Sequence, residues 1–108
     1  MRWLSFVRDG RATFGFVTAD GQGVVDVGAR GGYPDLRAAI AANALADLAR
    51  AAGSAADLPL AGLRYLPPIT NPEKILCVGL NYKAHQEETG RGGEGFPTIF
   101  TRFANAQI

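Results

Sequence analysis

The residues that most metal and disulfide sites need are nearly absent from this sequence: its 108 residues include one cysteine, Cys77, and one histidine, His85. A single cysteine cannot form a disulfide within the chain, and a lone thiol is typical of a reducing compartment. A secretory leader is not indicated, because charged residues between Arg2 and Arg11 interrupt the first apolar positions. We therefore expect a cytoplasmic protein.

Long apolar runs and clusters of like charge are missing as well. No stretch approaches the roughly 20 apolar residues that a membrane helix needs, so we expect no membrane partner. Eleven Lys and Arg against ten Asp and Glu give a net charge of +1, and the basic residues are scattered along the chain. A nucleic-acid-binding surface needs such residues on one face, so we expect no nucleic-acid partner either. A hydrophobic share of 47% instead indicates an ordinary folded domain.

The first pattern that the sequence does contain is a series of short segments rich in β-branched and aromatic residues, separated by turns. Asp-Gly pairs at 9–10 and 20–21 lie between these segments, and this pair favours hairpins because glycine adopts positive φ at little cost. We predict a β-meander that is covered on the side of Phe14 and Phe16. Its strands are expected at residues 2–7, 12–18 and 23–27.

A single amphipathic helix is predicted over residues 35–52. Asp35 is suited to cap it, because a carboxylate accepts a free N–H of the first turn, and Gly53 is suited to end it. The apolar residues recur at helical spacing and indicate packing rather than chemistry. This stripe consists of Leu36, Ile40, Ala44, Leu45, Leu48 and Ala52.

The proline-rich segment 66–73 separates this part from the rest and indicates a domain boundary. A short strand precedes it and ends at Pro67-Pro68, because proline cannot pair normally inside a sheet. After it, the continuous apolar run 74–80 predicts a strand covered on both faces. A helix at 82–88 and a strand at 98–103 are expected to follow.

Within the predicted helix 82–88, His85 and Glu88 lie three residues apart and so share one face. Imidazole transfers protons near neutrality, and a neighbouring carboxylate fixes its tautomer, so the pair suits acid–base catalysis. A solvated surface pair has the same spacing. The position between a buried strand and a glycine-rich segment favours a functional role, because such residues concentrate there. Residue types alone leave both interpretations open.

Other chemical roles are less well supported by the sequence. One imidazole with one or two carboxylates is too few ligands for a metal site, so none is predicted within the chain. Cys77 lies inside an apolar strand and is expected to pack as a small hydrophobe. The glycines of segment 90–95 form either a lid hinge or a loose loop. Arg102 either binds a carboxylate or faces solvent.

Two stretches, "PEKILCVGLNYKAHQEE" (72–88) and "FPTIFTRFANAQI" (96–108), closely resemble the start of the catalytic domain in the fumarylacetoacetate hydrolase family. The most specific part is G-L-N-Y-x-x-H-x-x-E at residues 79–88. The resemblance implies an α+β fold with two domains. Residues 1–67 would form a β-meander and helix domain, and residues 68–108 would begin a mixed β-roll catalytic domain.

The resemblance also implies a function and residue roles. Family members act on 2-oxo or 2,4-dioxo acids with a bound divalent ion, usually Mg²⁺ and otherwise Mn²⁺ or Ca²⁺, and often as homodimers. On this sequence, His85 would be the general base and Glu88 would orient it. Arg102 stands where the family often has a lysine near the substrate. The expected reaction is C–C hydrolysis of the acylpyruvate type.

The family's metal ligands are acidic residues farther along than Ile108, so we expect them to lie outside this chain. The chain then resembles the N-terminal part of such an enzyme and is expected to be inactive alone. An alternative function is isomerisation or decarboxylation of unsaturated 2-hydroxy dioic acids of aromatic catabolism, such as 2-hydroxyhepta-2,4-diene-1,7-dioate. A second alternative is a folded module without catalysis.

Overall fold

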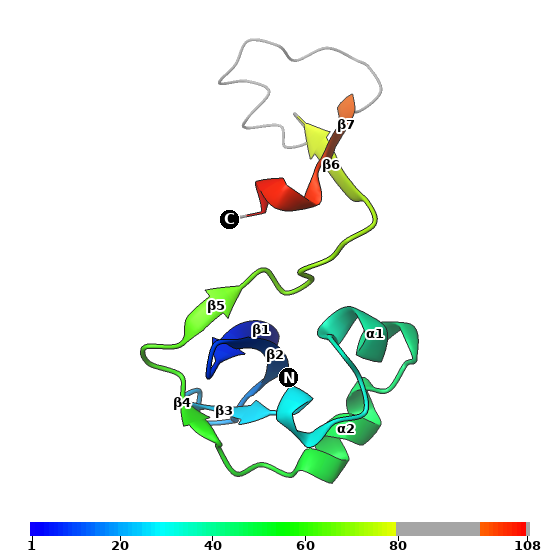
Figure 1. Cartoon of the computed structure of the whole chain (residues 1–108). Helices are drawn as coiled ribbons and strands as arrows, with labels where there is room; N and C mark the ends of the chain where they lie inside the picture. The colour runs from blue at the N-terminus through cyan, green and yellow to red at the C-terminus, as the bar shows by residue number, and fades with distance from the viewer. Residues whose placement is uncertain (80–97, 108) are drawn as a thin grey trace. The chain divides into compact units, whose positions relative to one another are not determined.

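The computed structural model describes residues 1–79 and 98–107, and these divide by their contacts into two units, Met1–Asn71 and Pro72–Gln107 (Figure 1). A five-stranded antiparallel sheet with two helices forms the first unit, so the α+β class predicted from the sequence is confirmed. The domain limits at 1–67 and 68–108 stay a prediction.

The predicted β-meander is present as strands β1 (Trp3–Arg8), β2 (Arg11–Val17) and β3 (Gly23–Asp26), each antiparallel to the next. Between β1 and β2, Asp9 and Gly10 both have positive φ, 51° and 76°. Two successive positive φ values are typical of the type I′ turn, whose twist matches that of the paired strands. The Asp-Gly signal therefore identified this hairpin correctly.

Two short strands extend the meander at its edges. The strand β5 (Arg64–Leu66) pairs with β1 and ends directly before Pro67, as the prolines predicted. The strand β4 (Leu58–Pro59) pairs with β3 and was not predicted, because two residues carry no periodic pattern. The strand order is β4-β3-β2-β1-β5.

Both faces of this curled sheet bury apolar side chains. On the predicted aromatic face, the rings of Phe14 and Phe16 lie under the helices, and Trp3 packs on both rings at centroid distances of 6.3 and 5.3 Å. The opposite face has a smaller cluster of Leu4, Phe6 and Val24, against which the chain between 58 and 63 packs. Fully buried positions on this face include Phe6 and Val24, at 0% exposure.

The predicted helix 35–52 is two helices, α1 (Leu36–Ala41) and α2 (Leu45–Ala52), so the single-helix prediction was wrong. The chain breaks at Asn43, which has a φ of 54°. This left-handed conformation stops an α-helix, and asparagine adopts it more readily than most residues. The predicted cap is confirmed, since the Asp35 carboxylate accepts the Ala38 N–H at 2.8 Å.

The break also changes which residues are buried. Ile40 was predicted in the apolar stripe but is 49% exposed, whereas Ala39 is fully buried beside Leu36. The reason is that α1 is too short to continue the stripe into α2, so each helix turns its own face to the sheet. Leu45 and Leu48 of α2 do pack against the core as predicted.

In the second unit, β6 (Ile75–Gly79) and β7 (Thr98–Arg102) form an antiparallel pair, and the 3₁₀ turn η2 (Ala104–Ala106) follows. The strand predicted at 74–80 is thus present, but the cover predicted for both faces is not found among the described residues. Leu76 and Val78 are 65% and 52% exposed. The predicted helix 82–88 lies outside the described residues, in which no helix is long and apolar enough to cross a membrane.

Two substitutions at Asn43 test the helix break, because a left-handed residue and a helical residue predict opposite orders of their free energies of unfolding. In a left-handed position Asn43→Ala should lower the free energy of unfolding by about 1 kcal/mol, and Asn43→Gly should leave it equal or higher. Urea unfolding of both variants measures this. In one continuous helix the order would be reversed, because alanine is the better helix former by about 1 kcal/mol.

Candidate functional site

The predicted catalytic pair, His85 and Glu88, lies outside the described residues, as do the glycines of segment 90–95. What the structure describes is the pair of strands on either side of that segment. Gly79, the last residue of β6, is the cross-strand partner of Thr98, the first residue of β7. The antiparallel register therefore places Gly79, where the family motif begins, beside Thr98, where the chain enters β7.

The register also sets which side chains share a face of this strand pair. Cys77 lies opposite Phe100, and Ile75 lies opposite Arg102. A Cβ added at Gly79 would lie 3.4 Å from the Phe100 ring, an ordinary van der Waals distance, so this ring lies beside the end of β6. Cys77 is a half-buried free cysteine, as expected for a packing residue.

Arg102 is exposed and lies at the end of β7. Its guanidinium donates a hydrogen bond to the carbonyl oxygen of Ala106 in η2. This contact is local and uses one N–H, so the other guanidinium donors remain able to bind a carboxylate. Within residues 1–79 and 98–107, no three His, Cys, Asp or Glu side chains gather in a way that could hold a metal ion.

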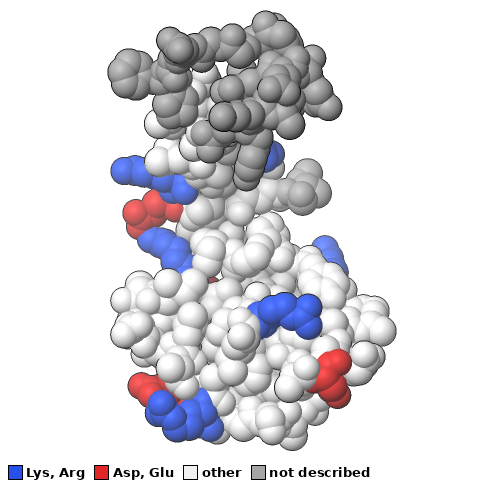
Figure 2. All heavy atoms as spheres, turned by 180° about the vertical axis from the view of Figure 1, so that it is seen from behind, with Lys and Arg blue, Asp and Glu red and all other residues white. Residues whose placement is uncertain are grey.

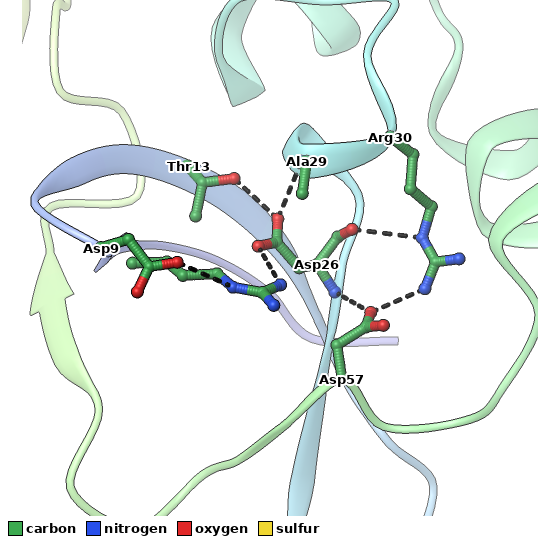
Figure 3. A network of polar contacts seen from close by, with 7 residues as sticks. Asp9, Thr13, Asp26, Ala29, Arg30 and Asp57 are labelled. Atoms are coloured by element: carbon green, nitrogen blue, oxygen red, sulfur yellow. Dashed lines mark hydrogen bonds and ion pairs between the residues drawn. The ribbon is translucent and has the colours of Figure 1, made fainter.

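The first unit contains a buried polar centre that the sequence analysis did not identify (Figure 3). Asp26, at the end of β3, is 1% exposed. One of its carboxylate oxygens accepts from the Thr13 hydroxyl at 2.7 Å and from the Ala29 N–H at 3.0 Å. The other accepts from the Arg8 guanidinium at 3.0 Å. Both oxygens of the Asp26 carboxylate are thereby paired with donors, which a buried carboxylate requires.

A second carboxylate supports the backbone of the same residue. Asp57 accepts the Asp26 N–H at 2.8 Å and an Arg30 N–H at 2.6 Å, while the Nε of Arg30 donates to the Asp26 carbonyl at 3.2 Å (Figure 3). The Asp26 N–H, followed by the Arg30 side chain, holds the pKa of Asp57 below its usual value. The hydrogen bond to Asp26 raises the pKa of Arg8.

An open hollow lies beside this centre, and its lining combines both signs of charge. Arg8 and Arg11 are balanced by Asp9 and Asp26, so the hollow favours neither anions nor cations. The oxygens of Asp26 are already occupied by donors of the chain. We conclude that the centre is structural. Its only sequence signal was an aspartate inside a run of valines, Val24-Val25-Asp26-Val27.

On the face shown in Figure 2, acidic and basic side chains form small separate groups rather than a stripe of one sign. Such a mixed surface provides no track for a phosphate backbone on this face.

Comparison with known proteins gives relatives for about half of the chain. It is similar to "Oxaloacetate tautomerase FAHD2A, mitochondrial" of Bos taurus, 39% identical over 51 residues, which cover 47% of this chain and 16% of the relative. It is also similar to "Oxaloacetate tautomerase Fahd2a, mitochondrial" of Rattus norvegicus, 40% identical over 57 residues, 50% of this chain and 18% of the relative.

A third relative has the family in its name: "Fumarylacetoacetate hydrolase domain-containing protein 2" of Pongo abelii, 35% identical over 51 residues, 47% of this chain and 16% of the relative. No protein-family model and no solved structure matches the chain. The matched part spans less than a fifth of each of these three relatives.

These matches show a family relation. The chain is related to the fumarylacetoacetate hydrolase family, and the family relation predicted from the sequence is confirmed. Among the relatives are proteins named as enzymes, the oxaloacetate tautomerases.

Removing the Asp26 carboxylate should lower the free energy of unfolding of the first unit by more than removing an exposed carboxylate does. Asp26→Ala leaves the partly buried side chains of Arg8 and Thr13 without their partner, and we expect a loss of about 3 kcal/mol in the free energy of unfolding. The control is Asp47→Ala, which breaks an exposed ion pair with Arg50 and should cost less than about 1 kcal/mol. Urea unfolding with equal losses in both variants would contradict a structural role for Asp26.

The lowered pKa of Asp57 makes its contribution depend on pH. The folded pKa lies below the ordinary value of 3.8, so the stabilisation is complete above that value and is lost as the pH falls through the folded pKa. We expect Asp57→Asn to lower the free energy of unfolding by about 1–2 kcal/mol at pH 7 and by less near about pH 2–3. A penalty of equal size at both pH values would show that the charge of Asp57 is unimportant.

Proposed function

We propose that this chain supplies the proton-transfer residues of an enzyme that acts on 2-oxo acids. The observation that carries this proposal is the 39% to 40% identity of about half the chain to relatives named oxaloacetate tautomerases. Oxaloacetate is a 2-oxo acid, and its tautomerisation moves a proton between C3 and the 2-oxo oxygen. An enolate of the same kind forms when the C–C bond of an acylpyruvate is cleaved, so one site chemistry serves both reactions.

In this proposal His85 is the general base and Glu88 orients it. The neutral imidazole takes a proton from C3, and the electron pair of the broken C–H bond moves toward the 2-oxo oxygen as an enolate. Return of the proton to that oxygen gives the enol, so no atom is gained or lost. Imidazole suits both directions near neutral pH, and a carboxylate three residues on favours its protonated form.

We propose a divalent ion, Mg²⁺ or otherwise Mn²⁺ or Ca²⁺, for the whole enzyme, where it would supply charge stabilisation for an enolate. The described residues do not fit such an ion, because no group of three possible ligands forms within 1–79 and 98–107. We place its ligands outside this chain, as the resemblance to the family implies, and assign no step of the reaction to it.

Three further expectations stay proposals. Residues 68–108 would begin a β-roll catalytic domain, the whole enzyme would be a homodimer, and it would act in the cytoplasm. The printed names of the bovine and rat relatives include the word mitochondrial, so the compartment needs its own experiment. Fractionation of the source cells, with the chain detected by antibody, decides it.

The reaction is tested by offering three substrates to the protein that contains this chain. We expect faster loss of the enol absorbance of oxaloacetate than in buffer, as the names of the relatives suggest. Cleavage of an acylpyruvate would instead support C–C hydrolysis, and turnover of 2-hydroxyhepta-2,4-diene-1,7-dioate would support the isomerase or decarboxylase alternative. Inactivity toward all three, with the protein folded, would favour a module without catalysis.

With whichever of these substrates the protein turns over, His85→Ala should lower kcat by about two to four orders of magnitude, which is the usual contribution of general-base catalysis to the rate. Glu88→Gln should also lower kcat, because the imidazole loses its orienting carboxylate. The matched control is the neighbouring Glu87→Gln, which makes the same chemical change and should keep kcat near that of the unaltered protein. A His85→Ala protein of normal kcat would remove His85 from the mechanism.

Arg102 is proposed to bind a carboxylate of the substrate, because it is exposed and keeps free donors beside its bond to Ala106. We expect Arg102→Ala to raise KM by about tenfold or more, because a charge-assisted hydrogen bond contributes about 1.5–3 kcal/mol to binding. Arg102→Lys keeps the charge but loses the planar fork, so its KM should be intermediate. If KM is unchanged in both variants, Arg102 is a surface residue.

A further inference from the structure

The segment 67–71, here called the strap, runs from the end of β5 to the last residue of the first unit. It begins with Pro67 and Pro68, which have no backbone N–H and so cannot extend the pairing of β5 with β1. A segment without strand pairing is commonly mobile. This one is nevertheless fastened to the first unit at three places.

The first fastening is a buried hydroxyl. Ser5, in β1, is 5% exposed, and its Oγ donates to the carbonyl oxygen of Pro68 at 2.7 Å. A buried hydroxyl needs a partner, and in a strand its neighbours' backbone groups are already engaged in the sheet. The carbonyl of Pro68 thus satisfies Ser5, and the strap is drawn against β1.

The second fastening is apolar and the third is polar. The Ile69 side chain packs against the cluster that the helices form with the sheet. The Asn71 side-chain N–H donates to Asp35 Oδ2 at 3.0 Å, and the Arg37 guanidinium donates to the Asn71 carbonyl at 3.4 Å. Because the other oxygen of Asp35 caps α1, one carboxylate joins the helix start to the strap.

We infer that the strap is a fixed part of the first unit, which confines the joint between the two units to residues 72–74. The strand β6 begins at Ile75, so this joint has three residues, whereas a loose strap would lengthen it to the eight residues 67–74. The reach of a flexible segment grows with the square root of its length, so the fastening limits the motion that the connection permits. This inference is independent of the proposed function.

Backbone ¹⁵N relaxation on the 108-residue chain measures the inferred rigidity. The order parameters of Ile69, Thr70 and Asn71 should equal those of β1, about 0.85. Values below about 0.6 in the strap of the unaltered chain would overturn the inference.

The fastenings are tested by the double variant Ser5→Ala/Asn71→Ala, which removes both side-chain donors. The order parameters of residues 69–71 should fall below about 0.6 while those of β1 and β2 are kept. Asp35→Ser is a second test, because serine can still cap α1 but offers no second carboxylate oxygen to Asn71. The control Asp47→Ala should leave the strap unchanged. A strap that stays as rigid as β1 in the double variant and in Asp35→Ser would contradict the roles assigned to these contacts.

Discussion

The first unit depends on the buried carboxylate of Asp26. Its oxygens bind donors from β1, β2 and the turn after β3, and its backbone N–H binds Asp57, which comes from the connection after α2. A charge held at 1% exposure is tolerated only when donors surround it, so all of these segments must be in place together. The apolar clusters supply most of the burial, while this centre specifies which strands meet and how the chain returns to the sheet.

A close approach in the same sheet illustrates how strictly the backbone is placed. At Gly15 in β2, an added Cβ would lie 2.0 Å from the carbonyl oxygen of Val25 in β3. Only glycine permits that distance, and Asp26, the cross-strand partner of Gly15, is thereby brought within reach of Thr13. Packing and polar pairing in this unit therefore depend on one another.

The second unit bears on the proposed function through the register of its two strands. Pairing of Gly79 with Thr98 joins the ends of the segment that contains the family motif, and Arg102 lies on the strand that follows it. Leu76, Val78 and Ile99 are exposed on this pair within the described chain. A two-stranded pair alone is marginally stable in water.

The sequence by itself determined the local features of this protein. Asp-Gly pairs specified the hairpin, Asp35 the start of α1, Pro67 the end of β5, and the spacing of residues 79–88 the family relation, because each signal depends on a few adjacent residues. Only the tertiary structure decided the rest: the break at Asn43, the exposure of Ile40, the strand β4 and the Asp26 centre. The Asp26 centre depends on Thr13 and Asp57, which lie 13 and 31 residues away along the chain, and no local pattern encodes such distances.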